Sequence, residues 1–565
     1  MSQAQRAYER WYEKAPELRE ALAALSMEEL EDQFGQSLAF GTGGLRGILG
    51  VGTGRMNEYT VAQATQGLAN YLLSQELEPS VVIARDTRNK SYEFSRAAAA
   101  VLCAAGVRVY WLEAVTPVPM LSFAVRYFSA SAGVVITASH NPKAYNGYKV
   151  YNADGGQITD IAAGNILAEI HNVDLFADVR RLDLGTAVEK GLLTIVPEGN
   201  EAFRNYYERI RRQVIRKDLV QLRGAELSVL YTPLYGSGNV PVRTALRESG
   251  FTKVEVVASQ TQPDGNFPGL VRPNPEEANV YEKAMAQAAH LHPDLIFATD
   301  PDADRIGVLV SDGQGGYSVL TGNQTGCLLL EYILQSLRDR GELPENAAVV
   351  KTIVTSDLAC KICDAYGVTL FDVLTGFKYI GEKIGQWEQS GEHSYLFGFE
   401  ESYGCLNHSF ARDKDAVAAS VLIAEMALWH KTQGRTLYDA LRAQWDSYGA
   451  AQEHLVTVPL TPAEQSARMT ALRDDWQTAF ADEKPTALED YLHSERRDLR
   501  TGEKTTLRLP VSNVLKFIFA DGAWLVLRPS GTEPLIKLYV HAIAGDLPAA
   551  TQRAEQLLTI GKSVL

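Results

Sequence analysis

The sequence predicts an α/β protein with three similar domains and a fourth, C-terminal α+β domain. Short apolar strands alternate with helices three times between residues 80 and 404, which is typical of parallel sheets covered by helices. From about residue 450 the strands follow one another more closely, with a turn at Ala520-Asp521-Gly522 that indicates antiparallel pairing. At roughly 150 residues per domain, the 565 residues suffice for three or four domains.

In the first domain, residues 1–35 have an amphipathic helical pattern with Trp11 and Leu22 at apolar positions. We expect this segment to pack on the rest of the domain. A helix over 91–106 ends at Gly106, because glycine favours a helix end. The strands predicted around it are 80–86, 107–112 and 132–142, the last of which runs into a loop.

The same pattern recurs in the second and third domains, and in each the last strand runs into a loop rich in polar side chains. The second domain has predicted strands at 226–239, 254–258 and 294–305 and a helix at 240–250. The third has strands at 347–356, 368–376 and 394–404 and a helix at 356–367. The fourth has strands within 454–460, 513–531 and 533–544 and a helix at 547–560.

Composition narrows the class of protein. The 69 acidic residues exceed the 54 basic ones, and the net charge of −15 argues against binding to nucleic acid or to an anionic membrane. The five cysteines do not make a disulfide framework, and we interpret Cys360 and Cys363 as buried helix positions. The N-terminal segment lacks a signal peptide, and the apolar stretch 416–429 is too short to span a bilayer. We therefore expect a cytoplasmic protein.

The first polar loop, 137–149, places Ser139 just after an apolar strand. An exposed serine there can act as a nucleophile or carry a phosphoryl group. His140 offers a hydrogen bond beside it, and Lys149 offers a group for proton transfer or phosphate binding. Taken alone, the loop is explained equally well as a serine turn with a solvated lysine.

The second polar loop, 298–307, contains Asp300, Asp302 and Asp304. Three adjacent carboxylates repel one another unless a cation lies among them, and their oxygens suit Mg²⁺. The loop is not an EF-hand, because Arg305 stands where that motif needs glycine. A solvated acidic turn is the alternative interpretation.

The third polar loop, 398–404, offers Glu400 and Ser402 from the end of a strand. A carboxylate and a hydroxyl two residues apart suit the adjacent hydroxyls of a sugar, although an exposed polar turn explains them equally well. Arg412 and Lys414 follow shortly afterwards and add positive charge.

The fourth polar loop, 528–534, has the composition of a phosphate-binding turn, with a plain turn as the alternative. Hydroxyls and backbone N–H groups can surround phosphate oxygens, and an arginine adds a bidentate contact. The residues concerned are Arg528, Ser530, Gly531 and Thr532. With one such loop in each domain, the four together indicate phosphoryl transfer on a phosphorylated sugar.

TASHNPKAYNGYK, ATDPDADR, GFEESYG and RPSGTEP, in this order, closely resemble the four active-site loops of the α-D-phosphohexomutases. The N-terminal helical segment and TGFKYIG are similar to the phosphoglucomutase/phosphopentomutase branch of that family. The resemblance implies three α/β domains with mixed sheets and a C-terminal domain similar to the TATA-binding protein, arranged around a central cleft. We expect these domains to span 1–215, 216–325, 326–450 and 451–565.

The resemblance also implies the reaction, in which phospho-Ser139 and glucose 1-phosphate form glucose 1,6-bisphosphate, which reorients and returns its other phosphate. Mg²⁺, held by Ser139 and the three aspartates, is the implied cofactor, and glucose 1,6-bisphosphate the activator. We favour Lys149 as general acid/base, because cationic neighbours would favour its neutral form, with Lys414 as the alternative. The other expected site residues are Arg46, His140, Arg305, Thr375, Gly376, Lys378, Glu400, Ser402 and Arg412, with Arg528, Ser530, Gly531 and Thr532 at the distal phosphate.

Other functions use the same loops. A phosphopentomutase acting on ribose or deoxyribose 1-phosphate, or a combined phosphoglucomutase/phosphomannomutase, would have the same motifs. A noncatalytic phosphosugar sensor would not need Ser139, and a phosphatase using Asp300 and Asp302 would leave that serine without a role. In every case the expected partner is a small phosphosugar, with no nucleic acid and no membrane, and the expected assembly is a monomer or a homodimer.

Overall fold

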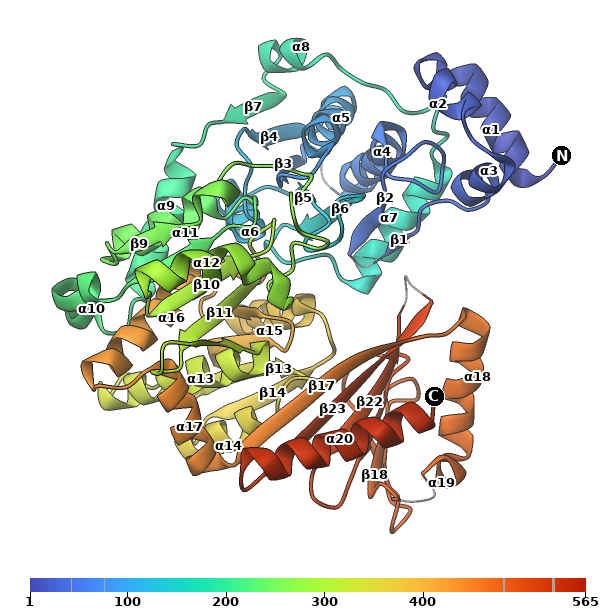
Figure 1. The fold of residues 1–565 in the computed structure, drawn as a ribbon. Helices are drawn as coiled ribbons and strands as arrows, with labels where there is room; N and C mark the ends of the chain where they lie inside the picture. The colour runs from blue at the N-terminus through green and yellow to red at the C-terminus, as the bar shows by residue number, and fades with distance from the viewer. Residues whose placement is uncertain (42, 76, 481–482, 531–533) are drawn as a thin grey trace.

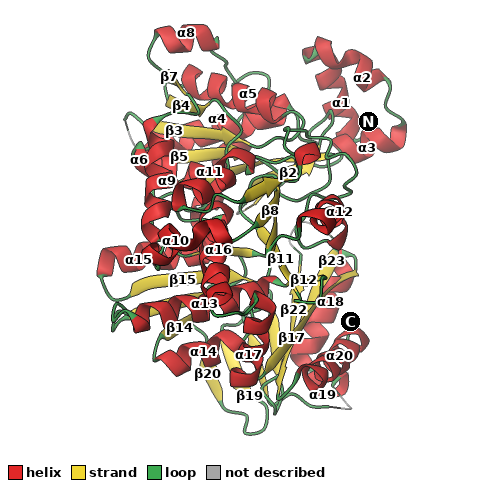
Figure 2. Cartoon of the chain, turned by 60° about the vertical axis from the view of Figure 1, so that its left-hand side comes forward, coloured by secondary structure: helices red, strands yellow, loops and turns green. Residues whose placement is uncertain are grey.

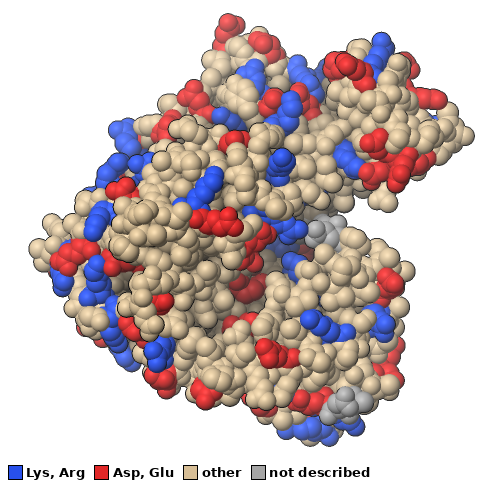
Figure 3. Space-filling model, viewed as in Figure 1, with Lys and Arg blue, Asp and Glu red and all other residues tan. Residues whose placement is uncertain are grey.

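The computed structural model describes residues 1–565 except 42, 76, 481–482 and 531–533. It confirms the predicted architecture of three α/β domains with mixed sheets and a C-terminal α+β domain (Figure 1). The four domains form one arc, and a hollow in the surface separates the first domain from the fourth. Acidic and basic side chains gather in this hollow (Figure 3).

The N-terminal segment is not one helix as predicted but three, α1 (Gln3–Lys14), α2 (Arg19–Ala23) and α3 (Met27–Phe34). Pro16 ends the first helical run because proline has no N–H to donate, and Ser26 starts the third helix with a capping box. Trp11 is buried and packs against the rings of Tyr59 and Phe176, which lie beyond this segment in the first domain. As expected, the segment therefore packs on the first domain.

The first domain has a seven-stranded mixed sheet in the order β1-β2-β6-β5-β3-β4-β7. Its strands are β1 (Phe40–Gly41), β2 (Gly44–Ile48), β3 (Ser80–Arg85), β4 (Arg108–Leu112), β5 (Ala132–Ile136), β6 (Tyr145–Asn152) and β7 (Leu193–Val196). Its helices are α4 (Glu58–Gln75), α5 (Ser91–Ala104), α6 (Val118–Tyr127), α7 (Asp160–Asn172), α8 (Leu184–Glu189) and α9 (Glu201–Gln213). Helices cover both faces of this sheet (Figure 2), which buries the apolar strands as a parallel sheet requires.

The second domain has a five-stranded sheet in the order β12-β11-β10-β8-β9. Its strands are β8 (Val229–Thr232), β9 (Val254–Val256), β10 (Leu295–Thr299), β11 (Ile306–Ser311) and β12 (Tyr317–Leu320). Its helices are α10 (Lys217–Arg223), α11 (Asn239–Ser249) and α12 (Glu282–Leu291).

The third domain has a four-stranded sheet in the order β14-β13-β15-β16. Its strands are β13 (Ala347–Thr352), β14 (Thr369–Val373), β15 (Ser394–Glu400) and β16 (Gly404–Leu406). Its helices are α13 (Gly322–Asp339), α14 (Leu358–Tyr366), α15 (Phe377–Ser390), α16 (Ala416–Thr432) and α17 (Leu437–Tyr448). The long apolar stretch is the buried helix α16, and among the described residues no helix combines the length and apolarity needed to cross a membrane.

The three α/β sheets share one feature that the strand–helix alternation did not predict. The strand before each polar loop pairs antiparallel with the strand after it, as β5 does with β6, β10 with β11 and β15 with β16. Each loop therefore joins the two strands of a hairpin, which holds both of its ends in place. This is why the sheets are mixed rather than purely parallel.

The fourth domain is an antiparallel seven-stranded sheet in the order β17-β23-β22-β21-β18-β19-β20. Its strands are β17 (Ala450–Pro459), β18 (Ala487–Asp490), β19 (Glu495–Asp498), β20 (Lys504–Thr506), β21 (Leu515–Ile518), β22 (Trp524–Pro529) and β23 (Leu535–Ala544). Helices α18 (Pro462–Asp474), α19 (Trp476–Ala479) and α20 (Leu547–Ser563) cover one face. The other face packs Trp524 and Tyr539 against Ile353 and Leu374, so the third and fourth domains share an apolar core.

Candidate active site

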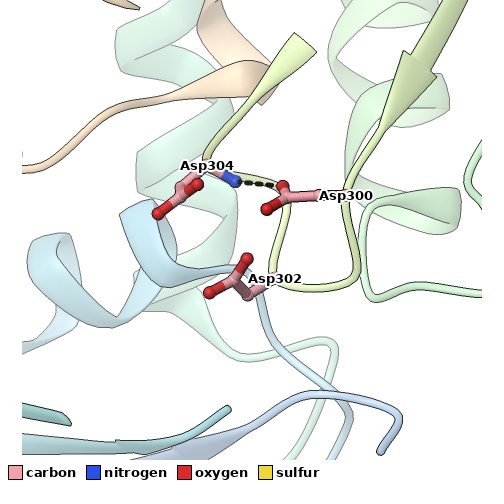
Figure 4. A group of neighbouring side chains, drawn as sticks. All are labelled: Asp300, Asp302 and Asp304. Atoms are coloured by element: carbon pink, nitrogen blue, oxygen red, sulfur yellow. Dashed lines mark hydrogen bonds between the residues drawn. The ribbon is translucent and has the colours of Figure 1, made fainter. Parts of the chain in front are cut away.

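The three aspartates of the β10–β11 loop converge in the interior of the protein (Figure 4). Asp300, Asp302 and Asp304 are buried, and one carboxylate oxygen of each lies within 4.8 Å of the others. Asp300 Oδ1 accepts hydrogen bonds from the backbone N–H groups of Asp304 at 3.2 Å and Arg305 at 3.1 Å. These bonds curl the loop around its own first carboxylate.

The charges and unpaired atoms of this cluster fit a divalent cation. Among the described residues, Asp302 Oδ1 and Asp304 Oδ1 are buried without a hydrogen-bond partner. Burial and the charge of Asp302 raise the pKa of both Asp300 and Asp304. Because buried carboxylates are rarely left unpaired, an arrangement of hard oxygen atoms like this one could hold a metal ion.

Ser139 lies against the aspartate cluster, although the two loops are far apart in the sequence. Its Oγ donates a hydrogen bond to Asp300 Oδ2 at 2.7 Å and lies 3.3 Å from His140 Nδ1. Its backbone φ is +50°, in the left-handed region that a non-glycine residue adopts only at a cost. Neighbouring contacts hold this conformation in place, and it turns the hydroxyl toward the carboxylates.

Three side chains to which the sequence analysis gave no role hold this loop. Thr137 Oγ1 accepts from the Ser139 N–H at 2.8 Å and lies 2.7 Å from Asp86 Oδ2 and 3.1 Å from Asp302 Oδ2. The buried guanidinium of Arg88 donates to the carbonyl of Ser139 at 2.6 Å. Asp86 and Arg88 directly follow β3, a polar segment after an apolar strand, and that position was the signal for them.

Both candidate proton-transfer lysines contact the aspartate cluster and share the carboxylate of Asp304. Lys149 Nζ lies 3.0 Å from Asp302 Oδ2 and 3.8 Å from Asp304 Oδ2, while Lys414 Nζ lies 3.2 Å from Asp304 Oδ2. The neighbours of Lys149 are thus anions, and the cationic surroundings expected from the sequence are replaced by ion pairs. Burial lowers the pKa of Lys414, but Asp304 and other nearby carboxylates outweigh it and raise that pKa.

The positive charge of Lys149 in turn acts on Asp302. Burial opposes ionisation of this carboxyl, but Lys149 donates to it and outweighs burial, so the pKa of Asp302 is lowered. One carboxylate of the cluster is therefore firmly anionic and is paired with the lysine. The backbone joins the two domains at the same point, because the Val118 N–H donates to the Asp302 carbonyl at 2.9 Å.

The predicted sugar loop closes another side of the site. Glu400 is buried, and its Oε1 accepts from the Gly376 N–H at 3.0 Å, which joins the loop 398–404 to the segment 375–381. Ser402 is partly exposed on the same loop. Arg305 donates to Glu276 Oε1 at 2.6 Å, a partner that the motifs did not indicate.

His140 is next to Ser139, partly buried and close to several cations. Burial, together with Arg305 and Arg46, holds its pKa well below the usual range, so the imidazole is neutral at pH 7. Arg46 lies 3.4 Å from Asn141 Oδ1, at the other end of the same loop. Both predicted residues are thus gathered around the Ser139 loop.

A cavity of about 380 Å³ lies where the first, third and fourth domains meet. It is lined by Thr375, Gly376 and Lys378 of the third domain and by Arg528 of the fourth. Ser530 closes its turn through a backbone bond from its N–H to the Leu535 carbonyl at 2.9 Å. The predicted phosphate ligands Gly531 and Thr532 lie outside the described residues.

Two residues near these loops differ from expectation. The guanidinium of Arg412 is buried and ion-paired with Glu388, so the structure directs it at the third domain's own helix α15. Lys537, which no motif indicated, is directly opposite Arg528 in the β22–β23 pair. Like charges opposite each other destabilise a sheet, so these two cations favour an anion between them.

Ser139, the three aspartates and both lysines meet where loops of the first three domains come together, and the cavity lined by Lys378 and Arg528 adds the fourth domain. These are the features expected of the α-D-phosphohexomutase class. The chain matches the phosphoglucomutase/phosphomannomutase α/β/α domains I, II and III at residues 37–176, 204–314 and 321–448. It matches the C-terminal domain of the same family at residues 476–558. The chain therefore belongs to the phosphoglucomutase/phosphomannomutase family.

Relatives cover nearly the whole chain. A phosphoglucomutase of Staphylococcus epidermidis is 37% identical over 533 residues, which is 93% of this chain and 94% of that protein. One from Staphylococcus aureus is 36% identical over 94% of both chains. The fold is shared with a putative phosphomannomutase of Thermus thermophilus (TM-score 0.68, 23% identity, 93% of this chain and 99% of that one) and with the phosphoglucomutase parafusin of Paramecium in its open form (TM-score 0.69, 15% identity, 94% and 95%).

Proposed function

We propose that this enzyme is a phosphoglucomutase that interconverts α-D-glucose 1-phosphate and glucose 6-phosphate. The observation that carries the proposal is the 2.7 Å contact between Ser139 Oγ and a buried three-aspartate cluster. Relatives named phosphoglucomutase, at 35–37% identity over more than nine-tenths of the chain, favour glucose over pentose phosphates as substrate. We propose phospho-Ser139 as the active form and glucose 1,6-bisphosphate as intermediate and activator.

The first half of the reaction moves the phosphoryl group to the sugar. The 6-hydroxyl oxygen of glucose 1-phosphate attacks the phosphorus, the P–Oγ bond of phospho-Ser139 breaks, and the P–O6 bond forms. The proton lost from O6 must be taken up and Ser139 Oγ must be protonated. Lys149 is the favoured group for this transfer, because it reaches the carboxylates around Ser139, and Lys414 is the alternative.

The second half runs the same step in reverse on the other phosphate. The bisphosphate reorients, Ser139 Oγ attacks the phosphorus of the 1-phosphate, and the P–O1 bond breaks. The proton lost from Ser139 Oγ is balanced by one delivered to O1, and glucose 6-phosphate leaves. Glu400 and Ser402 would contact sugar hydroxyls in both orientations, and Arg528 would hold whichever phosphate is not reacting. The same residues can serve both halves because the sugar offers similar hydroxyls from either side.

The cofactor that we propose is Mg²⁺, held by Asp300, Asp302 and Asp304 with an oxygen of phospho-Ser139. When bound, a divalent cation supplies electrostatic stabilisation of the charge that develops on the transferred phosphoryl group. The residues present fit it, since two buried carboxylate oxygens lack a partner within the described chain. One solved relative of the fold is an Aspergillus fumigatus N-acetylphosphoglucosamine mutase in complex with a sugar phosphate and magnesium.

The test is a coupled assay of glucose 6-phosphate formed from glucose 1-phosphate, with Mg²⁺ and a trace of glucose 1,6-bisphosphate. We expect fast turnover that the bisphosphate activates. Ribose 1-phosphate and mannose 1-phosphate, assayed in parallel, decide between the alternatives. Fast turnover of ribose 1-phosphate with slow turnover of glucose 1-phosphate would make the enzyme a phosphopentomutase and overturn the proposal.

We also propose a cytoplasmic location. All five cysteines are free thiols, as a reducing compartment favours. Fractionation of cells that produce the protein tests this location. A monomer or a homodimer stays the prediction for the assembly.

A further inference from the structure

One ion pair crosses the cavity between the first and third domains. Asp160, the first residue of α7, accepts a hydrogen bond from Lys378 Nζ at 2.6 Å through its Oδ1. Its Oδ2 accepts from the Tyr379 hydroxyl at 3.3 Å. A single carboxylate of the first domain thus engages two neighbouring side chains at the start of α15.

The same three side chains line the cavity that Arg528 reaches from the fourth domain. The Lys378 side chain is only 9% exposed, and within the described chain its carboxylate partner is Asp160. A sugar phosphate that enters this cavity meets Lys378, whose ammonium is already paired with the carboxylate of Asp160. It must either bind without Lys378 or take the place of the carboxylate.

The carboxylate of Asp160 can be displaced from Lys378. Its side chain is 53% exposed, so the carboxylate can turn into water without leaving a buried charge behind. Its place in the first turn of a thirteen-residue helix stabilises its negative charge through the helix dipole, whether or not Lys378 is paired. The pair is thus held by an exposed, replaceable anion on one side and a nearly buried cation on the other.

We propose that Asp160 is an internal substitute for a substrate phosphate: it holds Lys378 in place in the empty enzyme and is displaced when a phosphate binds. The inference rests on the proposed function for the identity of the ligand, a sugar phosphate. Its consequence is that Asp160 weakens phosphate binding and so speeds release of the product. It also keeps Lys378 positioned across the cavity between turnovers.

The test measures binding of inorganic phosphate by calorimetry to the full-length wild type and to Asp160→Asn. We expect the variant to bind phosphate about threefold more tightly, since a partly exposed ion pair no longer competes. Glu201→Gln is the matched control, because Glu201 is an exposed acidic residue in the first turn of α9, and it should bind as the wild type does. Asp160→Ser, which also removes the charge, should repeat the effect.

Two further readouts separate this role from a structural one. In a Lys378→Met background, Asp160→Asn should no longer change phosphate binding, which places the effect at that ammonium. With glucose 1-phosphate, Asp160→Asn should lower KM about threefold and leave kcat unchanged or lower. If Asp160 only fastened α15 to the first domain, the variant would bind phosphate more weakly and melt at a lower temperature, and that result would overturn the inference.

The inference and the proposed function fail differently. Wild-type enzyme that does not turn over glucose 1-phosphate contradicts the proposed function, and the phosphate titration still tests the competition by Asp160. Turnover in the wild type together with unchanged or weaker phosphate binding in Asp160→Asn contradicts the inference alone.

Discussion

Replacing Arg88 with methionine should remove the hydrogen bonds that hold the Ser139 loop in place beside the sheet. The guanidinium donates to the carbonyls of Ser139 at 2.6 Å, Pro142 at 2.9 Å and Tyr145 at 3.1 Å, and also to that of Asn141. It forms an ion pair with Asp86 in which both side chains are fully buried. Methionine keeps most of the volume but leaves the buried carboxylate of Asp86 without its opposite charge and the carbonyls without their donor.

The size of the effect follows from these contacts. Breaking a buried ion pair by removing one partner costs about 3–5 kcal/mol. For a domain of this size, that corresponds to a fall in melting temperature of about 6–20 °C. Because Arg88 also sets the position of the serine, a shift of about 1 Å in the loop should lower kcat about 100-fold.

Thermal unfolding followed by circular dichroism, together with the coupled mutase assay, measures both effects. Arg108→Met is the matched control, because Arg108 is half exposed and its distance to Glu78 is 4.0 Å, and it should melt within about 1 °C of the wild type. Arg88→Lys, which keeps the charge but not the planar fork, should recover part of the stability. An Arg88→Met enzyme with wild-type melting and wild-type kcat would refute the reasoning.

The other predictions concern the reacting groups and one buried acid. Ser139→Ala should lower turnover by several orders of magnitude and abolish incorporation of radiolabelled phosphate, and retained turnover would contradict the phosphoserine. Asp302→Asn should weaken the Mg²⁺ dependence and the rate together, and a fast, metal-independent variant would remove the metal site. Arg528→Ala should mainly raise KM for glucose 1-phosphate, so a loss confined to kcat would mean that it does not hold the distal phosphate. Burial raises the pKa of Glu453 from 4.5 to about 7, so its ionisation destabilises the fold increasingly between pH 4.5 and 7. Glu453→Gln should therefore have a higher melting temperature than the wild type at pH 8. An equal difference in melting temperature at pH 4 would contradict this.

Local patterns were enough to predict the fold class and the strand that leads into each polar loop. Apolar runs such as Val81–Ile83 become buried strands wherever helices cover both faces, and glycines such as Gly250 end helices because they adopt a left-handed conformation easily. The patterns did not predict strands β18, β19 and β20. The sequences of β19 and β20, ERRD and KTT, have no apolar alternation because this edge of the sheet is partly or fully exposed, and β18 is mostly buried but only four residues long.

Residue types and their spacing were enough to predict which chemical groups the site contains. The two clearest signals are a serine directly after a strand and three aspartates in one loop. How those groups meet depends on contacts between distant segments of the chain. The contact between Ser139 and Asp300 spans 161 positions, and the pairing of Lys149 with Asp302 replaces the cationic surroundings that we had expected. The contacts that Asp86, Arg88 and Asp160 make were likewise visible only in the folded chain. Their roles come from ion pairs and hydrogen bonds between distant segments, and neither local pattern nor spacing along the chain encodes such contacts.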